Sequence, residues 1–195
     1  MSTSRSRKEL SHERIVEVAS RAIRRAGYHG VGVADIMKEA GLTHGGFYAH
    51  FGSRDEMLVE AMRHAARDSG GALMEHVARR EAQGESRFVA LVQAYLRDEE
   101  LENAECGCIV AALSSEMSRQ GEAVRDEARQ RVLNMVSAAR SALPDGIDNA
   151  RADAVAATLI GAMQMARTLG GKAGKALLAR TREALISEYE PERAG

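Results

Sequence analysis

Apolar residues recur every three or four positions along most of the chain, which is the period of an α-helix with one buried face. The first such run predicts a helix over residues 12–26, with Ser11 as its N-cap and Gly27 as the residue that ends it. A connection broken by glycines follows. After it comes the short helical segment "ADIMKEA", which Gly41 ends.

A second short helix is expected in "LTHGGFYAHF", where Thr43 stands at the N-cap position. Two short helices joined by a short turn that contains a glycine predict a helix-turn-helix. Ser53 is followed by a glutamate three residues on, which is the spacing of a capping box and opens a long helix. We expect this helix to run to about Arg80, with a kink at Gly70-Gly71 as the alternative.

The rest of the chain continues this pattern, and five further runs begin near Phe88, Ile109, Val124, Val155 and Leu177. The chain has only two prolines, so almost nothing forbids long helices. Hydrophobic residues make up 45% of the chain, which is enough for a core of ordinary size. The sequence therefore predicts an all-α fold of about nine helices.

Charge is distributed unevenly along the chain, although the formal net charge is only −1. Residues 1–54 hold nine of the 27 Lys and Arg residues and five of the 28 Asp and Glu residues, so this part carries +4 and the remainder −5. A basic first quarter is compatible with binding of nucleic acid by the N-terminus. Ordinary scatter of charge is the alternative explanation.

No targeting or membrane segment stands out in the sequence. Residues 1–8 are polar, and the apolar stretch of a secretory signal does not follow them. The most apolar segment, residues 152–171, contains an aspartate, an arginine and a glutamine, so it predicts a buried helix or an interface. Two cysteines cannot form a disulfide framework. We therefore expect a cytoplasmic protein that takes no cofactor.

The stretch "LTHGGFYAHFGSRDEM" places two adjacent glycines inside the second helix of the motif, although each weakens a helix by about 1 kcal/mol relative to alanine. In a helix-turn-helix the first turn of this helix meets base edges in the major groove, and glycines there let the backbone approach DNA. Gly45 and Gly46 are therefore interpreted as a place of close approach, with His44 as the best candidate for a base contact. A plain loop is the alternative.

The aromatic and basic residues of this stretch are expected to divide between core and DNA. Phe47 and Phe51 lie four positions apart, so they face inward together. Tyr48 then points outward, where its hydroxyl reaches phosphate, and His50 and Arg54 meet the same backbone. The alternative is a core cluster of all three aromatic residues, beside histidines that are merely solvated.

These residues also carry a resemblance. Over "RIVEVASRAIRRAGYHGVGVADIMKEAGLTHGGFYAHFGSRDEMLVEAM", and most specifically over "AGLTHGGFYAHFGSRDEM", the chain resembles the N-terminal domain of TetR/AcrR-family transcriptional regulators. The resemblance implies an all-α homodimer that binds an operator and a small ligand. With the Ser/Arg-rich residues 1–9 as a flexible basic arm, it implies a DNA-binding domain over 10–56 and a ligand-binding and dimerisation domain over 57–190.

The resemblance also implies roles for individual residues by their position. The phosphate-contacting positions are Tyr48, His50 and Arg54, with arginine in place of the more usual lysine. The start of the recognition helix is formed by Thr43, His44, Gly45 and Gly46. One departure is Val33, because the family often has a serine or threonine there that caps the helix and touches phosphate. Compensating phosphate or minor-groove contacts are expected from Arg5, Arg7 and Lys8.

A ligand pocket in the C-terminal domain is expected to be lined mainly by apolar residues, namely Phe88, Leu91, Tyr95, Cys108, Leu113, Met117, Met135 and Met163. The nine methionines of the chain suit an adaptable apolar pocket, although a single methionine is more often core filling. Few strongly polar groups fall on these helix faces. We therefore expect an apolar or amphipathic effector.

Cys106 and Cys108 leave several interpretations open. A metal site lacks supporting ligands nearby, and a disulfide between the two would be strained. A thiol sensor needs a depressed thiol pKa, which Glu102 and Glu105 would oppose. A free, buried cysteine is the plainest alternative.

The last two long helices, about residues 151–170 and 175–189, are predicted to dimerise, because two from each subunit form a four-helix bundle. The residues expected at this interface are Ala156, Leu159, Gly161, Met163, Leu177 and Leu185. The alternative is that this face belongs to the subunit's own core. A two-fold dimer would place its recognition helices about 34 Å apart on a palindromic operator.

Functions from three classes are compatible with these patterns. The first is a repressor that a small effector releases from its operator, with the helix that starts at Ser53 linking pocket to DNA-binding domain. The second is an all-α enzyme with His44, His50 and His64 as an acid–base set, although the sequence names no catalytic or metal-binding residue. The third is a helical interaction module that has lost DNA binding.

Overall fold

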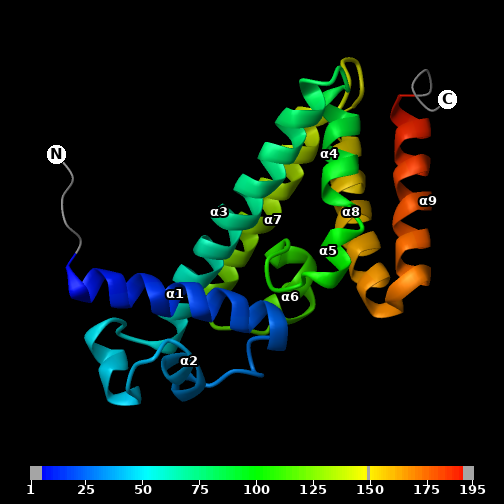
Figure 1. Cartoon of the computed structure of the whole chain (residues 1–195). Coiled ribbons are helices and arrows are strands. Elements are labelled where there is room, and N and C mark those ends of the chain that lie inside the picture. Colours follow the sequence, from blue (N-terminus) through cyan, green and yellow to red (C-terminus); the bar gives the residue numbers. More distant parts are fainter. Residues whose placement is uncertain (1–5, 149, 191–195) are drawn as a thin grey trace.

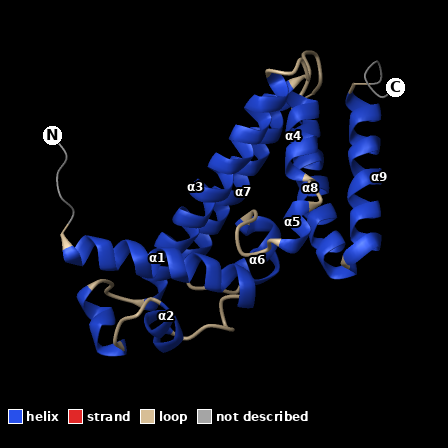
Figure 2. Ribbon diagram, viewed as in Figure 1, coloured by secondary structure: helices blue, strands red, loops and turns tan. Residues whose placement is uncertain are grey.

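The computed structural model describes residues 6–148 and 150–190, and within these ranges every regular element is a helix (Figures 1 and 2). The predicted all-α fold is confirmed. In chain order the elements are α1 (Arg7–Ala26), α2 (Val33–Glu39), the 3₁₀ helix η1 (His44–Ala49), α3 (Arg54–Glu81), α4 (Arg87–Tyr95), α5 (Glu99–Glu102), α6 (Ile109–Met117), α7 (Glu122–Ala142), α8 (Ala150–Leu169) and α9 (Gly171–Tyr189).

The first helix begins one turn earlier than the sequence analysis predicts. Ser6 is its N-cap: the Ser6 hydroxyl accepts from the backbone N–H of Glu9 at 3.2 Å, and the Glu9 carboxylate accepts from the backbone N–H of Ser6 at 2.7 Å. This reciprocal capping box satisfies two free N–H groups, which Ser11 with Arg14 at the box position cannot do. The expected arm over residues 1–9 therefore overlaps α1, and Arg5 lies outside the described residues.

An N-terminal apolar cluster joins α1, α2 and η1 to the first half of α3 and to α6. Phe47 and Phe51 are buried in it with their rings stacked 5.4 Å apart, which confirms that they face inward. Met57 and Met62 of α3 lie in the same cluster, fully buried. The helix-turn-helix is thus packed directly onto the start of the long helix.

The long helix α3 leaves the N-terminal cluster and runs beside α7 toward the far end of the molecule (Figure 1). It continues through Gly70 and Gly71 as one helix to Glu81, so the predicted extent to about Arg80 is confirmed and the two glycines do not end the helix. Beyond the two glycines, Leu73 packs against the C-terminal apolar cluster, which is built from α4, α7, α8 and α9. One helix therefore belongs to both cores.

The C-terminal pair α8 and α9 packs closely at the side of the molecule away from α1 (Figure 1). A turn at Gly170 and Gly171, both with positive φ, reverses the chain between them. At Gly174 a side chain would collide with the backbone carbonyl of Ala166, so glycine permits this close approach. None of the described helices is both long enough and apolar enough to cross a membrane.

The C-terminal end of α1 is held by polar contacts to α6 and the loop before it. The Glu116 carboxylate accepts from the backbone N–H of Tyr28 at 3.0 Å. Arg24 is only 5% exposed and donates to the carbonyl oxygens of Ser20 at 3.0 Å and Gly107 at 3.1 Å. These contacts join the helix-turn-helix region to the C-terminal body without passing through α3.

Gly27 gives a test of this junction. Its φ of +77° is strained for any other residue, and a Cβ there would lie 2.5 Å from a Glu116 carboxylate oxygen. We expect Gly27→Ala to lower the free energy of unfolding by about 1–2 kcal/mol for the backbone and by about 1 kcal/mol or more for the displaced carboxylate. Urea unfolding followed by circular dichroism measures this.

Gly84→Ala is the matched control, since Gly84 has φ +90° and open space around its Cα. It should show the backbone cost alone. Equal losses in the two variants would mean that Glu116 does not constrain the end of α1.

Candidate nucleic-acid interface and effector cavity

The recognition segment is a 3₁₀ helix, not the α-helix that the sequence analysis expects. Its backbone bonds span three residues, from Gly46 N–H to Thr43 O at 3.0 Å and from His50 N–H to Phe47 O at 2.9 Å. Thr43 is the N-cap residue, as predicted, with extended backbone, but its side chain makes no capping hydrogen bond. Paired glycines favour α-helix poorly, and without the side-chain cap the tighter form prevails.

This segment presents an open surface to solvent. Thr43, His44 and Gly45 are exposed, and Tyr48 is 74% exposed, which confirms that it points away from the core. A Cβ added at Gly45 would meet nothing within 4 Å. Packing within the described chain therefore does not require glycine at this position. Close approach of another molecule to the backbone would explain why the chain has glycine here.

His50 lies between core and solvent, beside His12 with ring centroids 5.9 Å apart. Its Nδ1 is shielded and has no hydrogen-bond partner in the described chain. Burial lowers the pKa of His50, and the nearby His12 and Lys8 lower it further. A neutral ring at neutral pH can share a hydrogen bond with phosphate but does not supply the charge of a lysine or arginine.

Arg54, expected at phosphate, is engaged inside the molecule. Its guanidinium donates to the carbonyl oxygen of Tyr28 and so ties the start of α3 to the connection after α1. The side chain is half-buried, so a contact of its remaining N–H groups with DNA stays a prediction.

The sequence analysis missed several residues at this end of the molecule. Asp35 accepts from the backbone N–H of Gly32 at 3.2 Å and so supplies part of the cap that Val33 cannot provide. Arg14 and Lys38 are exposed cations that make no ion pair within the described chain. The sequence could have indicated Asp35 through the Gly-x-x-Asp spacing at the start of α2. It could have indicated Arg14 and Lys38 through their positions on the polar faces of α1 and α2.

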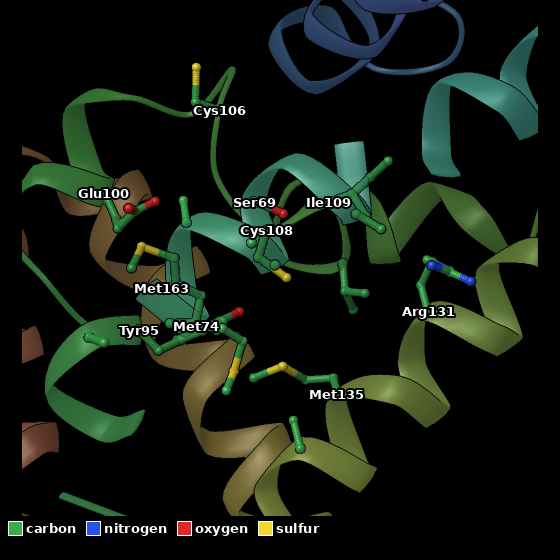
Figure 3. A pocket seen from close by; sticks show the side chains of 18 of the residues that line it. Ser69, Met74, Tyr95, Glu100, Cys106, Cys108, Ile109, Arg131, Met135 and Met163 are labelled. Atoms are coloured by element: carbon green, nitrogen blue, oxygen red, sulfur yellow. The ribbon is translucent and has the colours of Figure 1, made fainter. Parts of the chain in front are cut away.

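A cavity of about 480 Å³ lies where α3, α4, α6, α7 and α8 meet (Figure 3). Four of the expected pocket residues line it, namely Tyr95, Cys108, Met135 and Met163. The other four do not. Phe88 packs on the ring of Tyr189, Leu91 lies in a small cluster with Val77, and Leu113 and Met117 belong to the N-terminal apolar cluster. Helical periodicity predicts which face of a helix is buried. It does not tell whether that face lines a cavity or packs against another helix.

The wall of the cavity also holds charged groups that the sequence analysis did not expect. They are Arg67, Arg97, Glu100, Arg131 and Arg167. The expectation of few strongly polar groups is therefore wrong. Arg167 stands within the apolar run of α8, where its charge was the available signal.

Cys106 and Cys108 are free thiols on either side of Gly107, at the wall of the cavity. In Figure 3 the Cys108 sulfur turns toward Tyr95, and the Cys106 sulfur points away. Cys106 is exposed and Cys108 half-buried, so the expectation of a buried cysteine fails for Cys106. Among the described residues, no group of three potential His, Cys, Asp or Glu ligands gathers for a metal ion.

The residues expected at a dimer interface lie mostly inside the subunit. Ala156, Leu159, Met163 and Leu185 are buried in the C-terminal apolar cluster, and Gly161 and Leu177 are half-buried. The prediction took the most apolar face of α8 for an interface, but that face covers the subunit's own core. The alternative of a core face is the one that holds for these four.

Comparison with known proteins agrees with this arrangement. Residues 15–61 match the family model described as bacterial regulatory proteins of the tetR family. The uncharacterized HTH-type transcriptional regulator YxaF of Bacillus subtilis (strain 168) is 29% identical over 120 residues, which are 59% of this chain and 60% of that protein. The chain thus matches less than two thirds of this relative's length.

Solved structures share the fold over nearly the whole chain. A TetR-family transcriptional regulator from Agrobacterium tumefaciens has a TM-score of 0.74 and 21% identity, covering 91% of this chain and 98% of its own. One from Cytophaga hutchinsonii has a TM-score of 0.75 and 17% identity, covering 96% and 98%. The matched family model and the Bacillus subtilis relative are described as regulatory proteins and as a transcriptional regulator, respectively, and neither supports the alternative of an enzyme built on His44, His50 and His64.

The lowered pKa of His50 predicts how stability depends on pH. The unfolded chain takes up the proton near the ordinary value of about 6.5, before the folded chain does. The free energy of unfolding should therefore fall as the pH drops below about 6.5. His50→Gln removes this proton uptake and should reduce the loss, as urea unfolding across this pH range would measure.

His44→Gln is the control, since its ring is exposed on the same segment. An acid dependence in His50→Gln that equals that of the unmodified chain would contradict the assignment.

Proposed function

We propose that this chain, which belongs to the tetR family of bacterial DNA-binding transcriptional regulators, is a repressor that leaves a palindromic operator when a small effector fills its cavity. The observation that carries the proposal is the course of α3. This helix buries Met57 and Met62 against the helix-turn-helix and supplies Ser69 to Met74 to the cavity wall. A ligand that moves α3 therefore acts on the DNA-binding surface directly.

We assign the DNA contacts to the exposed end of η1 and to the start of α1. Gly45 permits the backbone to approach the groove, and His44 beside it is in position to meet a base edge. The exposed Tyr48 hydroxyl contacts a phosphate. Arg7 and Lys8, in the exposed first turn of α1, neutralise phosphates further along the duplex.

A second connection supports communication between cavity and DNA. Gly107 lies between two cavity-lining cysteines, and its carbonyl accepts from the buried Arg24 of α1. A ligand that displaces this loop shifts the end of α1 as well as α3. Effector and operator affinities then change each other by the same factor, because the two binding equilibria are linked.

A homodimer would present two such surfaces to a palindrome. We propose that it forms through the outward faces of α8 and α9. These faces carry the exposed Ala154, Thr158 and Met165 and the half-buried Gly161 on α8, and the exposed Ala173, Ala176 and Ala184 on α9. Small side chains allow helices of two subunits to approach closely in a four-helix bundle. The half-sites would lie about 34 Å apart.

The test of the function is salt-dependent binding to duplex DNA from the region upstream of the protein's own coding sequence. The affinity of the unmodified chain for DNA should fall steeply as the salt concentration rises, because phosphate contacts release counterions. Tyr48→Phe, which removes only a hydroxyl, should weaken binding by roughly threefold to tenfold, about 1 kcal/mol. Fluorescence anisotropy measures both.

Failure to bind this DNA, and failure to select any sequence from a random duplex pool, by a folded dimer would refute the proposal. It would favour an interaction module.

Gly45 gives a sharper test of close approach. Because an added Cβ meets only open space, Gly45→Ala should leave the free energy of unfolding unchanged or raise it by up to about 1 kcal/mol. Its operator affinity should nevertheless fall by about tenfold, or about 1.4 kcal/mol.

Ser137→Ala is the control, because Ser137 is an exposed helical residue of α7, outside the cavity wall and away from η1, where alanine also favours the helix. Measured without effector, it should bind DNA like the unmodified chain. Unchanged DNA affinity in Gly45→Ala would exclude a close backbone approach at this residue.

A further inference from the structure

One end of the cavity contains a hydroxyl donor that lacks an acceptor. Tyr95 is only 5% exposed, and its hydroxyl makes no hydrogen bond to any nitrogen or oxygen of the described chain. The Cys108 thiol lies beside it, but sulfur accepts hydrogen bonds weakly. In Figure 3 the hydroxyl points into the space among Met74, Met135 and Cys108. Burial raises the pKa of Tyr95, so the hydroxyl keeps its proton.

Arg167 supplies a second unused donor near the same place. Its Nε and Nη2 donate to the carbonyl oxygen of Glu100, at 3.4 and 3.1 Å. Its Nη1 is shielded from solvent and has no partner within the described residues. Arg167 and Tyr95 both line this cavity, and the charge of the guanidinium lowers the pKa of Tyr95, against the larger effect of burial. A guanidinium does not lose its proton, so this group can only donate.

The charges around these donors leave a positive excess. Arg97 pairs with Glu100, the one acidic residue of the cavity wall. Arg131 pairs with the buried carboxylate of Glu127 at 2.9 Å. Arg167 makes no ion pair with any described carboxylate. Arg67 of the cavity wall makes no described ion pair either, but its side chain is exposed. Arg167 is therefore the partly enclosed cation of the cavity without a counterion, and its shielded Nη1 favours an anion.

The remaining wall is apolar, and three methionines from three different helices form much of it. Met74, Met135 and Met163 come from α3, α7 and α8, and Ile109 and Val110 add branched side chains from α6. Thioether side chains adapt to irregular apolar shapes. A volume of about 480 Å³ is within the range of sites for small organic molecules.

We propose that the effector is an amphipathic monoanion, whose single carboxylate accepts hydrogen bonds from Tyr95 and Arg167 while its apolar body lies against the methionines. This proposal rests on the proposed function in taking the cavity as the effector site. A cation would meet uncompensated positive charge. An uncharged alcohol would satisfy the donors but leave Arg167 without a counterion, and a dianion would find the other two enclosed arginines already paired.

Matched probes that differ only in the head group test the class of effector. Isothermal titration calorimetry would compare decanoate with decan-1-ol and with decylammonium, and naphthalene-2-carboxylate with naphthalene-2-methanol. At least one carboxylate should bind roughly tenfold or more tightly than its alcohol, and decylammonium should bind most weakly. Equal affinities within both pairs, tighter binding of the alcohols, or no binding by any probe would overturn the proposal.

Variants locate the head group. Tyr95→Phe keeps the ring and removes the donor, and Arg167→Met removes the charge while keeping much of the side chain's length. Each should reduce the preference for carboxylate over alcohol by about threefold to tenfold. Arg140→Met, an exposed arginine of α7 outside the cavity wall, is the control and should leave the preference unchanged. Thermal unfolding checks that each variant folds, and an unchanged preference in folded Tyr95→Phe and Arg167→Met would overturn the assignment.

DNA binding distinguishes this inference from the proposed function. If the chain prefers carboxylates but binds no duplex, the ligand class stands and the repressor proposal fails. If it binds its operator with a steep salt slope yet shows no preference for carboxylates, only the ligand class fails. Release of bound DNA by the preferred carboxylate, and not by its alcohol, would support both.

Discussion

The structure depends on the continuity of α3 between two apolar clusters. A helix transmits displacement along its axis because each backbone carbonyl before its last turn is bonded to the N–H four residues on. The N-terminal part of α3 is locked by fully buried methionines against α1, and its middle forms the cavity wall. A change in the shape of the cavity therefore cannot be absorbed locally without either bending the helix or moving the helix-turn-helix.

The end of α1 adds a second constraint of a different kind. Apolar contacts tolerate sliding, whereas the Glu116 carboxylate and the Arg24 guanidinium each require a particular backbone group at hydrogen-bond distance. Breaking either contact leaves a charge in a poorly solvated place, which is costly. The end of α1 is thus attached to α6 and the loop before it by directional bonds, in addition to the apolar contacts that α3 makes in both clusters.

Periodicity and caps predicted the helices well, because burial of one face is a local property of sequence. The two differences from the predicted helices also have local causes. The capping box of Ser6 and Glu9 starts α1 before Ser11, and two glycines without a side-chain cap favour a 3₁₀ helix in η1. The cavity was harder to predict, because its arginines and apolar residues come from helices far apart in sequence. Whether a buried face meets a void, a neighbour or another subunit is decided by packing, as Leu113 and Leu159 illustrate.

Because α3 contributes residues to both apolar clusters, it also limits how DNA-binding and C-terminal regions of related proteins can be recombined. A crossover at Ser53, the apparent border of the DNA-binding region in sequence, would set Met57, Leu58 and Met62 of one parent against the α1 of another. A crossover beyond Ala65, the last residue of α3 in the N-terminal apolar cluster, keeps the part of that cluster from α1, α2, η1 and α3 together, although its α6 and α7 residues would come from the other parent. Even then, the contacts of Arg24 with the Gly107 carbonyl and of Glu116 with the Tyr28 N–H would join segments from different parents. Where related genes have recombined and exchanged DNA-binding specificity, we expect the recombination points to lie within α3 and not at Ser53, where the helix-turn-helix ends.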